Sequence, residues 1–247
     1  MTELGVIGFG NFSKFFLPHL KPHFSEITVF DLKDVKNEVE NNGFKFGKLE
    51  EVASKDTVML AVPVQYLEDL LVQTSPFFRT HALVMDVSSV KIKPIELMEK
   101  YLPKDVQIVG THPLFGPQSG KNGIKGLNFV VCPVRTNRMK RLNELFGEKL
   151  GLNVLLRSPE EHDLQMAYVQ GLTHFIGRAV NHMDIPDVEQ KTPAYQYMLE
   201  IKKNLGGDSW DLFLTIEKEN PFAVQIRERF LKELGSLHDI LKSPEDL

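Results

Sequence analysis

The chain has 247 residues, enough for one large domain or two of modest size. Charged residues make up 25%, and the net charge of -4 gives no basic footprint for nucleic acid. No apolar run approaches the ~20 residues needed to cross a bilayer. The opening MTELGVIGFG enters a strand-like run at once, so we expect no signal or transit peptide. One cysteine, Cys132, excludes an internal disulfide, so we expect a soluble, cytoplasmic protein that binds neither membrane nor nucleic acid.

Short apolar runs alternate with amphipathic stretches through the first half of the chain. Strands are expected at residues 4–8, 27–30, 57–62, 82–87, 106–111, 129–132 and 154–156. Helices are expected at residues 11–20, 66–72, 92–101 and 138–149. Near-continuous aliphatic strands separated by helices predict an α/β domain whose parallel sheet is covered on both faces.

A domain boundary is expected near Ser158. This serine, Pro159 and Glu161 have the spacing of an N-cap, a first-turn proline and a capping-box glutamate. Beyond it the strand signal disappears, and helices are expected at about 159–184, 192–205, 208–218 and 221–241. We therefore predict a dinucleotide-binding domain over 1–157 and an all-helical domain over 158–247. The helical segment needs a partner to bury its apolar faces, which predicts a homodimer.

A glycine-rich turn joins the first strand to the first helix. Gly8 permits the tight turn, and Gly10 lets the backbone approach a pyrophosphate on the helix N-terminus. Ser13 replaces the usual third glycine and is still small. Asp31 ends the second strand, where its carboxylate can accept from both ribose hydroxyls and repel a phosphate at the 2′ position. The pattern predicts a Rossmann-type site that prefers NAD to NADP; the alternative is an ordinary turn beside a surface aspartate.

Loops after the third and fourth predicted strands should face the nicotinamide half of the cofactor, because ligands bind outside the carboxyl ends of such strands. For Pro63 and Asp86, a purely structural role as turn residues is the alternative. The predicted cofactor-binding residues are Gly8, Phe9, Gly10, Asn11, Phe12, Asp31, Ala61, Val62, Pro63, Asp86 and Ser88.

A long loop rich in glycine, proline and polar residues follows the fifth predicted strand, and His112 stands at its start. Histidine is the side chain best suited to exchange a proton near neutral pH. We therefore predict that His112 is catalytic, against the alternative of a histidine that stabilises the turn. Long loops on a rigid sheet are common places for catalysis.

The first helix of the second half carries a polar stripe. Gln170, His174 and Arg178 follow one another at intervals of four and should share one face. The stripe faces either a ligand cavity or water. His162, beside Asp163, is interpreted as structural, and the histidines do not have the spacing of a metal site.

Together these segments resemble the prephenate/arogenate dehydrogenase family of tyrosine biosynthesis. The resemblance rests on GFGNFS, AVPV, DVSSVK, GTHPLFGPQSGKNG and QGLTHFIGR, in this order over most of the chain. The GTHPLFGPQSGKNG loop and the late DSWDLF segment are most similar to the plant-type arogenate dehydrogenases. The family implies a nucleotide-binding domain, a helical dimerisation domain and NAD(P)-dependent oxidative decarboxylation of prephenate or arogenate.

The resemblance also implies roles for single residues. His112 corresponds to the histidine that accepts the proton of the substrate's ring hydroxyl as hydride leaves for the nicotinamide. Ser89 corresponds to a serine that orients the same hydroxyl, and His174 to a histidine of the substrate pocket. Without a fused regulatory domain, inhibition by tyrosine would be competitive at the active site.

Two departures from the family bear on the substrate. In an ungapped comparison, Asn204 stands where many bacterial members have an arginine for a substrate carboxylate, so Arg178 is our candidate, with Lys121 or Lys191 as alternatives. Gln118 stands where many relatives carry an acid that could pair with the amino group of arogenate. The missing charge favours prephenate, with Gln118 and Gln170 as further substrate contacts.

Two other functions fit the same architecture. The first is a dehydrogenase or reductase for another small hydroxy acid or imine. Such enzymes typically place a lysine or another residue at the hydride-transfer centre, so His112 argues against this alternative. The second is a non-catalytic protein that senses NAD, which the missing arginine would permit. The joint presence of Ser89, His112 and His174 favours an active enzyme.

Overall fold

The computed structural model describes residues 2–205 and 208–242. The chain forms two compact units, Met1–His162 and Asp163–Leu247. The division falls a few residues beyond Ser158, inside helix α7 (Pro159–Met166). The expected capping box is present, because Glu161 N donates to Ser158 Oγ over 3.1 Å and Ser158 N donates to Glu161 Oε2 over 3.0 Å.

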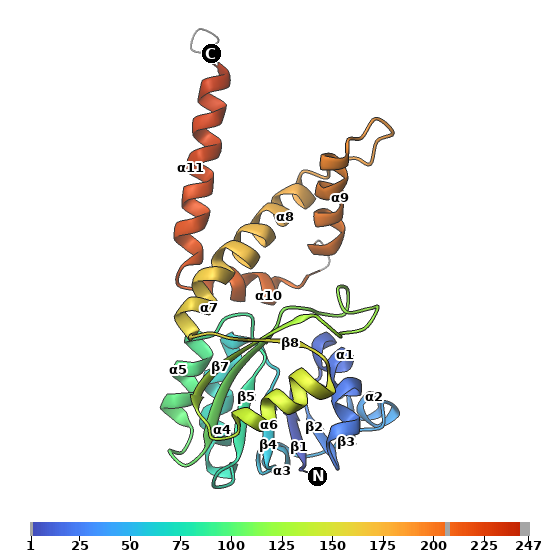
Figure 1. Cartoon of the computed structure of the whole chain (residues 1–247), viewed down its shortest axis with the longest axis vertical. Helices are drawn as coiled ribbons and strands as arrows, with labels where there is room; N and C mark the ends of the chain where they lie inside the picture. The colour runs from blue at the N-terminus through green and yellow to red at the C-terminus, as the bar shows by residue number, and fades with distance from the viewer. Residues whose placement is uncertain (1, 206–207, 243–247) are drawn as a thin grey trace. The chain divides into compact units, whose positions relative to one another are not determined.

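A single twisted sheet organises the described part of the first unit (Figure 1). Its strands are β1 (Leu4–Ile7), β2 (Ile27–Phe30), β3 (Lys45–Phe46), β4 (Thr57–Leu60), β5 (Leu83–Asp86), β6 (Gln107–Pro113), β7 (Asn128–Arg135) and β8 (Asn153–Leu156). They lie in the order β3-β2-β1-β4-β5-β6-β7-β8. The first six follow the order of a doubly wound dinucleotide-binding fold, which confirms the predicted fold class.

The direction of the strands changes at one pair. Strands β1 to β6 are parallel to their neighbours, whereas β7 runs antiparallel to β6, and β8 is parallel to β7. The cause is the connection, because a parallel pair needs a crossover that is usually helical. The loop from β6 to β7 contains no regular helix and returns along the same edge, while α6 (Met139–Asn143) and the π-helical turn η4 (Glu144–Lys149) separate β7 from β8.

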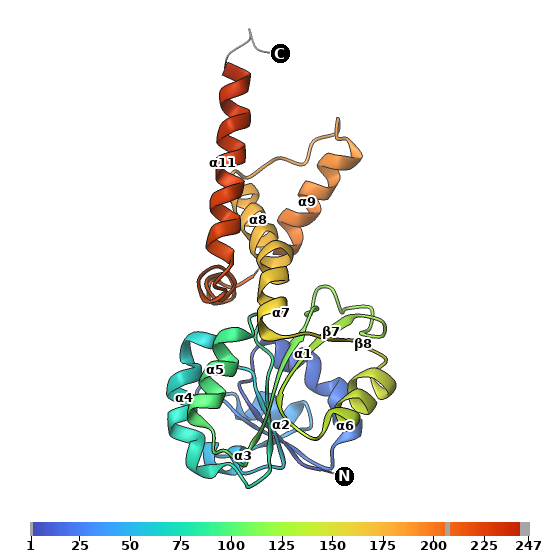
Figure 2. The ribbon, with the colours of Figure 1, turned by 60° about the vertical axis from the view of Figure 1, so that its left-hand side comes forward.

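Helices cover both faces of this sheet (Figure 2). Helix α1 (Asn11–Leu20) lies with α6 on one face, while α4 (Leu67–Thr74) and α5 (Ile92–Tyr101) lie on the other. Side chains alternate between the two cores along each strand, so that Met59 packs in one core, and Val58 and Leu60 in the other. The sequence did not predict α2 (Lys36–Asn41), α3 (Leu49–Ala53) and β3, which are too short for a clear periodicity.

The described residues of the second unit form helices and the loops that connect them. Its first helix continues from α7 through a π-helical segment, η5 (Ala167–Leu172), into α8 (Thr173–His182). The remaining elements are α9 (Pro193–Leu205), α10 (Trp210–Leu214), the π-helical η6 (Thr215–Glu219) and α11 (Ala223–Lys242). Among the described residues of both units, no helix has the length and apolar character needed to cross a membrane.

Candidate active site

The glycine-rich turn has the geometry expected of a dinucleotide site. Gly8 has φ +106°, and a Cβ at this position would lie 2.4 Å from the carbonyl oxygen of Ala61. Only glycine fits there, because the backbone is in the left-handed region and the loop after β4 packs directly against it. A Cβ on Gly10 would meet no atom within 4 Å, so the space above the start of α1 is open.

Two side chains hold this turn in place. The hydroxyl of Ser13 donates to the carbonyl oxygen of Gly8 over 2.7 Å. The backbone N–H of Phe9 donates to Asp31 Oδ2 over 2.7 Å, and Lys33 N–H donates to Oδ1 over 2.9 Å. Asp31 therefore lies at the turn, as the sequence predicts. Gly10 is the N-cap residue of α1 and offers no side-chain cap, so the first N–H groups of the helix can bind an anion.

Asp86, the last residue of β5, is placed differently from the prediction that it contacts the cofactor. Asp86 is fully buried, and its Oδ2 accepts from Ser88 N over 3.0 Å and from the ammonium of Lys91. The same ammonium donates to the carbonyl oxygen of Thr111 over 2.6 Å. A fully buried ion pair thus ties the end of β5 to the end of β6. In this geometry Asp86 supports the loop, while Ser88 and Ser89 remain partly exposed.

His112 lies within β6 rather than in the loop after it. The parallel pairing with β5 ends at Asp86 and Gly110, and β6 continues to Pro113 paired with β7 alone. His112 is opposite Val130 in this antiparallel extension, so its backbone is held rigidly beyond the end of β5. The carboxyl ends of β1, β4 and β5 form the same edge of the sheet. His112 and the glycine turn therefore lie at the same end of the sheet, where the parallel strands have their carboxyl ends.

The environment of His112 keeps its imidazole neutral. The side chain is 3% exposed, and burial lowers its pKa well below the usual value, with smaller effects in the same direction from His162 and Lys91. A neutral imidazole can accept a proton. Its Nδ1 lies 2.8 Å from Nε2 of His162, which stands in the first turn of α7. Sequence reasoning interpreted His162 as structural and gave Lys91 no role.

The loop after β6 carries the predicted substrate contacts of the first unit. Gln118 and Lys121 are both exposed. The loop folds on itself, because Gly120 N–H donates to the carbonyl oxygen of Gly116 over 2.8 Å and Gly116 N–H donates to Ser119 Oγ over 3.0 Å. Its side chains are thus presented on a hydrogen-bonded turn.

The polar stripe of the second unit is less regular than predicted. His174 and Arg178 lie one turn apart on α8, whereas Gln170 lies in η5, where the wider π-helical turns change the spacing. His174 is buried, and burial, with a smaller effect of Arg178, lowers its pKa to about 4. Its Nδ1 lies 3.5 Å from Oδ2 of Asp208.

The guanidinium of Arg178 already has partners inside the second unit. It donates to the carbonyl oxygens of Asp208 and, over 3.2 Å, Ser209, and it lies 4.8 Å from the ring centroid of Trp210. Lys191 is paired with Asp187 at 2.5 Å. Both carbonyl contacts are made by Nη2, whereas the Nε–H of Arg178 has no hydrogen-bond partner among the described residues.

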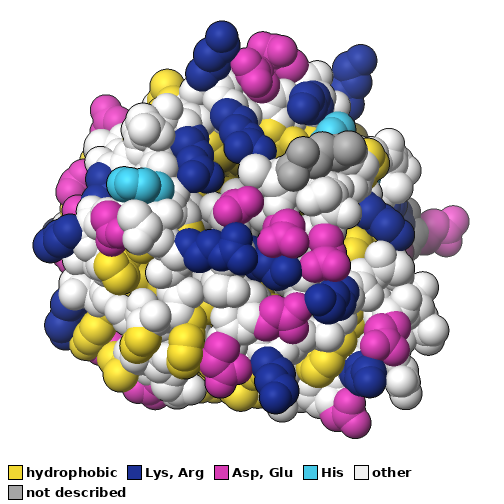
Figure 3. All heavy atoms as spheres, turned by 90° about the horizontal axis from the view of Figure 1, so that it is seen from below, with side chains coloured by type: hydrophobic (Ala, Val, Ile, Leu, Met, Phe, Trp, Pro, Cys, Tyr) yellow, Lys and Arg dark blue, Asp and Glu magenta, His cyan; other side chains and the backbone are white. Residues whose placement is uncertain are grey.

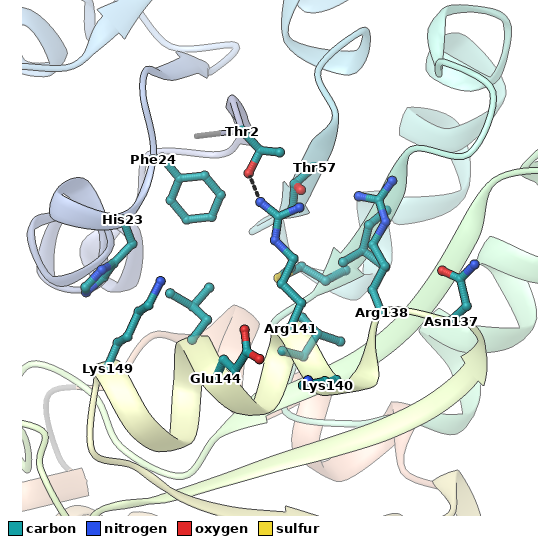
Figure 4. Close-up of a pocket in the computed structure, with 14 residues that line it drawn as sticks. Thr2, His23, Phe24, Thr57, Asn137, Arg138, Lys140, Arg141, Glu144 and Lys149 are labelled. Atoms are coloured by element: carbon teal, nitrogen blue, oxygen red, sulfur yellow. Dashed lines mark hydrogen bonds between the residues drawn. The ribbon is translucent and has the colours of Figure 1, made fainter.

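A cavity of about 420 Å³ lies at the opposite edge of the first unit's sheet (Figure 4). It is lined near the amino ends of the strands by Thr2 and Thr57 and along α6 by basic side chains. Arg141 donates to Thr2 Oγ1, and Arg138 donates to His81 O over 2.7 Å. Figure 3 shows this side of the molecule, where basic and acidic side chains intermingle. The arginines anchor α6 to the chain, so this cavity is distinct from the candidate active site.

The fold and the glycine turn define a dinucleotide-binding α/β domain followed by a helical domain. Residues 19–151 match the family model described as prephenate dehydrogenase, nucleotide-binding domain, and residues 179–246 match a TYRAAT1-like C-terminal domain. The chain belongs to the prephenate dehydrogenase family. This confirms the resemblance carried by the sequence motifs.

Named relatives agree with this assignment. The chain is 32% identical over 247 residues to arogenate dehydrogenase 1, chloroplastic, of Arabidopsis thaliana, covering 95% of this chain and 38% of the relative. It is 32% identical over 238 residues to arogenate dehydrogenase 2, chloroplastic, of the same plant, covering 92% and 66% respectively. The chain thus spans only part of these relatives. The crystal structure of prephenate dehydrogenase from Aquifex aeolicus superposes with a TM-score of 0.77 at 25% identity, covering 99% of this chain and 93% of that chain.

Proposed function

We propose that the chain catalyses the NAD-dependent oxidative decarboxylation of prephenate or arogenate. The observation that carries the proposal is His112, a buried and neutral imidazole held on β6 at the sheet edge where the glycine turn opens. A neutral base beside a dinucleotide site is what oxidation of an alcohol requires. Membership of the prephenate dehydrogenase family supports the substrate class.

The cofactor site fits a dinucleotide. The open space at Gly10 admits a pyrophosphate against the start of α1, and Asp31 lies where ribose hydroxyls would be bound. Bound there, the dinucleotide supplies the hydride acceptor. The carboxylate of Asp31 supports NAD over NADP, because it repels a phosphate at the 2′ position.

The chain's own residues supply a proton acceptor and orientation. His112 takes the proton of the ring hydroxyl, and Ser89 orients that hydroxyl. Loss of carbon dioxide then makes the ring aromatic, so the protein's task is to position the substrate and to accept one proton. His174 in the second unit is the proposed substrate-pocket histidine, with Gln170 and Arg178 as neighbours in sequence.

The neutral, exposed amide of Gln118 supports prephenate over arogenate, since it offers no charge to an amino group. The ratio of kcat/KM on the two substrates measures this preference. A clear preference for arogenate would contradict the assignment of Gln118.

We also infer a homodimer. Helix α11 exposes apolar side chains at intervals of three, four and seven residues, among them Val224, Leu231, Leu234 and Leu241. Such a stripe is typical of a helix that packs against another subunit. Sedimentation showing only monomers at micromolar concentration would refute this inference. A cytoplasmic location stays a prediction.

The variant His112→Asn tests the proposed function. It removes the proton acceptor but keeps a polar side chain of smaller volume, so we expect turnover to fall by ~10²–10⁴-fold while NAD binding is retained. Unaltered turnover would exclude His112 from the reaction. Turnover of the wild type in the same assay distinguishes an enzyme from a non-catalytic NAD-binding protein, which would show none.

A further inference from the structure

Two buried histidines meet at the end of β6. His112 Nδ1 and His162 Nε2 are 2.8 Å apart, although the residues are separated by 50 positions in the chain. The rings are inclined by 67° with centroids 5.1 Å apart, so they meet edge to face rather than stacked. His162 is 1% exposed. The geometry is that of a hydrogen bond between ring nitrogens.

This contact restricts the protonation states of the pair. Only one hydrogen can lie between the two nitrogens, so one ring donates and the other accepts. If Nδ1 of His112 accepts, its proton is on Nε2 and the ring cannot act as a base there. If Nδ1 of His112 donates, Nε2 carries the lone pair. Only the second tautomer accepts a proton from a substrate hydroxyl through Nε2.

We propose that His162 is a positioning residue, whose Nε2 accepts the Nδ1–H of His112 and so fixes His112 in the tautomer and orientation that receive the substrate proton at Nε2. The proposal rests on the dehydrogenase function proposed above. In the reaction the hydroxyl O–H bond breaks, its electron pair forms the ring carbonyl, hydride leaves the same carbon for the oxidised nicotinamide, and the proton goes to Nε2. His112 becomes an imidazolium, whose bond to His162 is then charge-assisted and stronger.

A buried ion pair supports the segment of β6 that carries His112. Burial is the main cause that lowers the pKa of His112, and His162 and Lys91 add smaller effects in the same direction. The ammonium of Lys91 is bound to Asp86 and to the carbonyl oxygen of Thr111 in the residue just before His112. The buried ion pair of Lys91 and Asp86 therefore holds the backbone next to His112 in place. In this arrangement Nε2 of His162 accepts the hydrogen bond from the Nδ1–H of His112. The aspartate of the serine protease triad holds its catalytic histidine in the same way.

The test compares two substitutions of His162. His162→Gln places an amide oxygen near the position of Nε2 and keeps an acceptor. His162→Phe keeps an aromatic ring, slightly larger than imidazole, and removes the acceptor. We expect His162→Phe to lower kcat by ~10²–10⁴-fold with the KM for NAD changed less than about threefold, and His162→Gln to restore at least about tenfold of the loss. Equal activity of wild type and His162→Phe would overturn the proposal, as would equal losses in Phe and Gln variants that bind NAD normally.

A double-variant cycle shows whether His162 acts through His112. In the His112→Asn background, adding His162→Phe should change turnover less than about threefold, because the group it positions is gone. Independent, multiplicative losses would contradict positioning.

A spectroscopic readout does not depend on turnover. In ¹⁵N NMR of the wild-type protein without substrate, Nδ1 of His112 should have the shift of a protonated nitrogen and Nε2 that of an unprotonated one. The opposite assignment would overturn the proposal even in an active enzyme. An inactive wild type with the expected tautomer would instead contradict the proposed function and leave the hydrogen-bond assignment standing.

Discussion

Replacing Lys91 by methionine tests how much the buried ion pair of Lys91 and Asp86 stabilises the strand ends that carry the candidate active site. Lys91 and Asp86 have fully buried side chains, and Oδ1 of Asp86 has no hydrogen-bond partner among the described residues. Removing the ammonium therefore leaves a carboxylate in the core without its cation, and the carbonyl of Thr111 loses a donor. Breaking a buried ion pair costs about 3–5 kcal/mol, which corresponds to a fall in Tm of roughly 6–20 °C for a protein of this size.

The control is a matched change in an exposed pair of the same unit. Lys100 lies 3.1 Å from Glu68, and both side chains are largely exposed, so Lys100→Met should lower Tm far less than Lys91→Met does. The double variant Asp86→Leu/Lys91→Met removes both charges and should recover about 2 kcal/mol or more of the single variant's loss.

The assay must report on the first unit. The single tryptophan, Trp210, lies in the second unit, so its fluorescence follows the wrong part of the chain. Calorimetry, or hydrogen exchange of the amides in β5 and β6, is suitable. Equal destabilisation by Lys91→Met and Lys100→Met, or no recovery in the double variant, would refute the argument that the pair supports this edge.

Further predictions concern the glycine turn, cofactor preference and pH. Gly8→Ala should lower the free energy of unfolding by more than about 1 kcal/mol because of its positive φ and the contact with Ala61, whereas Gly10→Ala should fold normally but raise the Kd for NAD at least about tenfold. Calorimetry and titration separate the two. Asp31→Asn should lower kcat/KM with NAD and raise it with NADP, and an unchanged ratio would contradict the placement of the ribose. His174 has a folded pKa of about 4 against 6.5 for the free side chain, mainly because of burial. Above pH 6.5 the side chain of His174 is neutral in the folded and in the unfolded protein. Below pH 6.5 the unfolded chain takes up the proton first, so the free energy of unfolding should fall by at most roughly 3 kcal/mol between pH 6.5 and 4. Urea unfolding across this window should show a flatter pH dependence in His174→Gln.

Local patterns predicted much of the cofactor half. The glycine turn at Gly8, the acidic residue Asp31 directly after β2 and the rigid placement of His112 could each be predicted from a strand and the residues at its carboxyl end. The capping box at Ser158 was equally local and predicted the start of α7.

Tertiary contacts explain what the sequence did not predict. The pairing of His112 with His162 joins β6 to α7, and no spacing in the chain encodes it. Lys91 is five residues from Asp86, a spacing that does not distinguish a buried pair from a solvated one. Gln170 lies in the π-helical η5, whose wider turns do not keep the α-helical spacing from which the polar stripe was predicted. Each of these depends on how distant elements pack or on how one helix is wound.

The most direct test of the central claim is the stoichiometry of the reaction. Purified protein is mixed with NAD and prephenate, and separately with arogenate, while NADH and carbon dioxide are measured together. Oxidative decarboxylation predicts that the two appear in equal amounts with at least one substrate. NADH without carbon dioxide, or no turnover in protein that binds NAD, would contradict it.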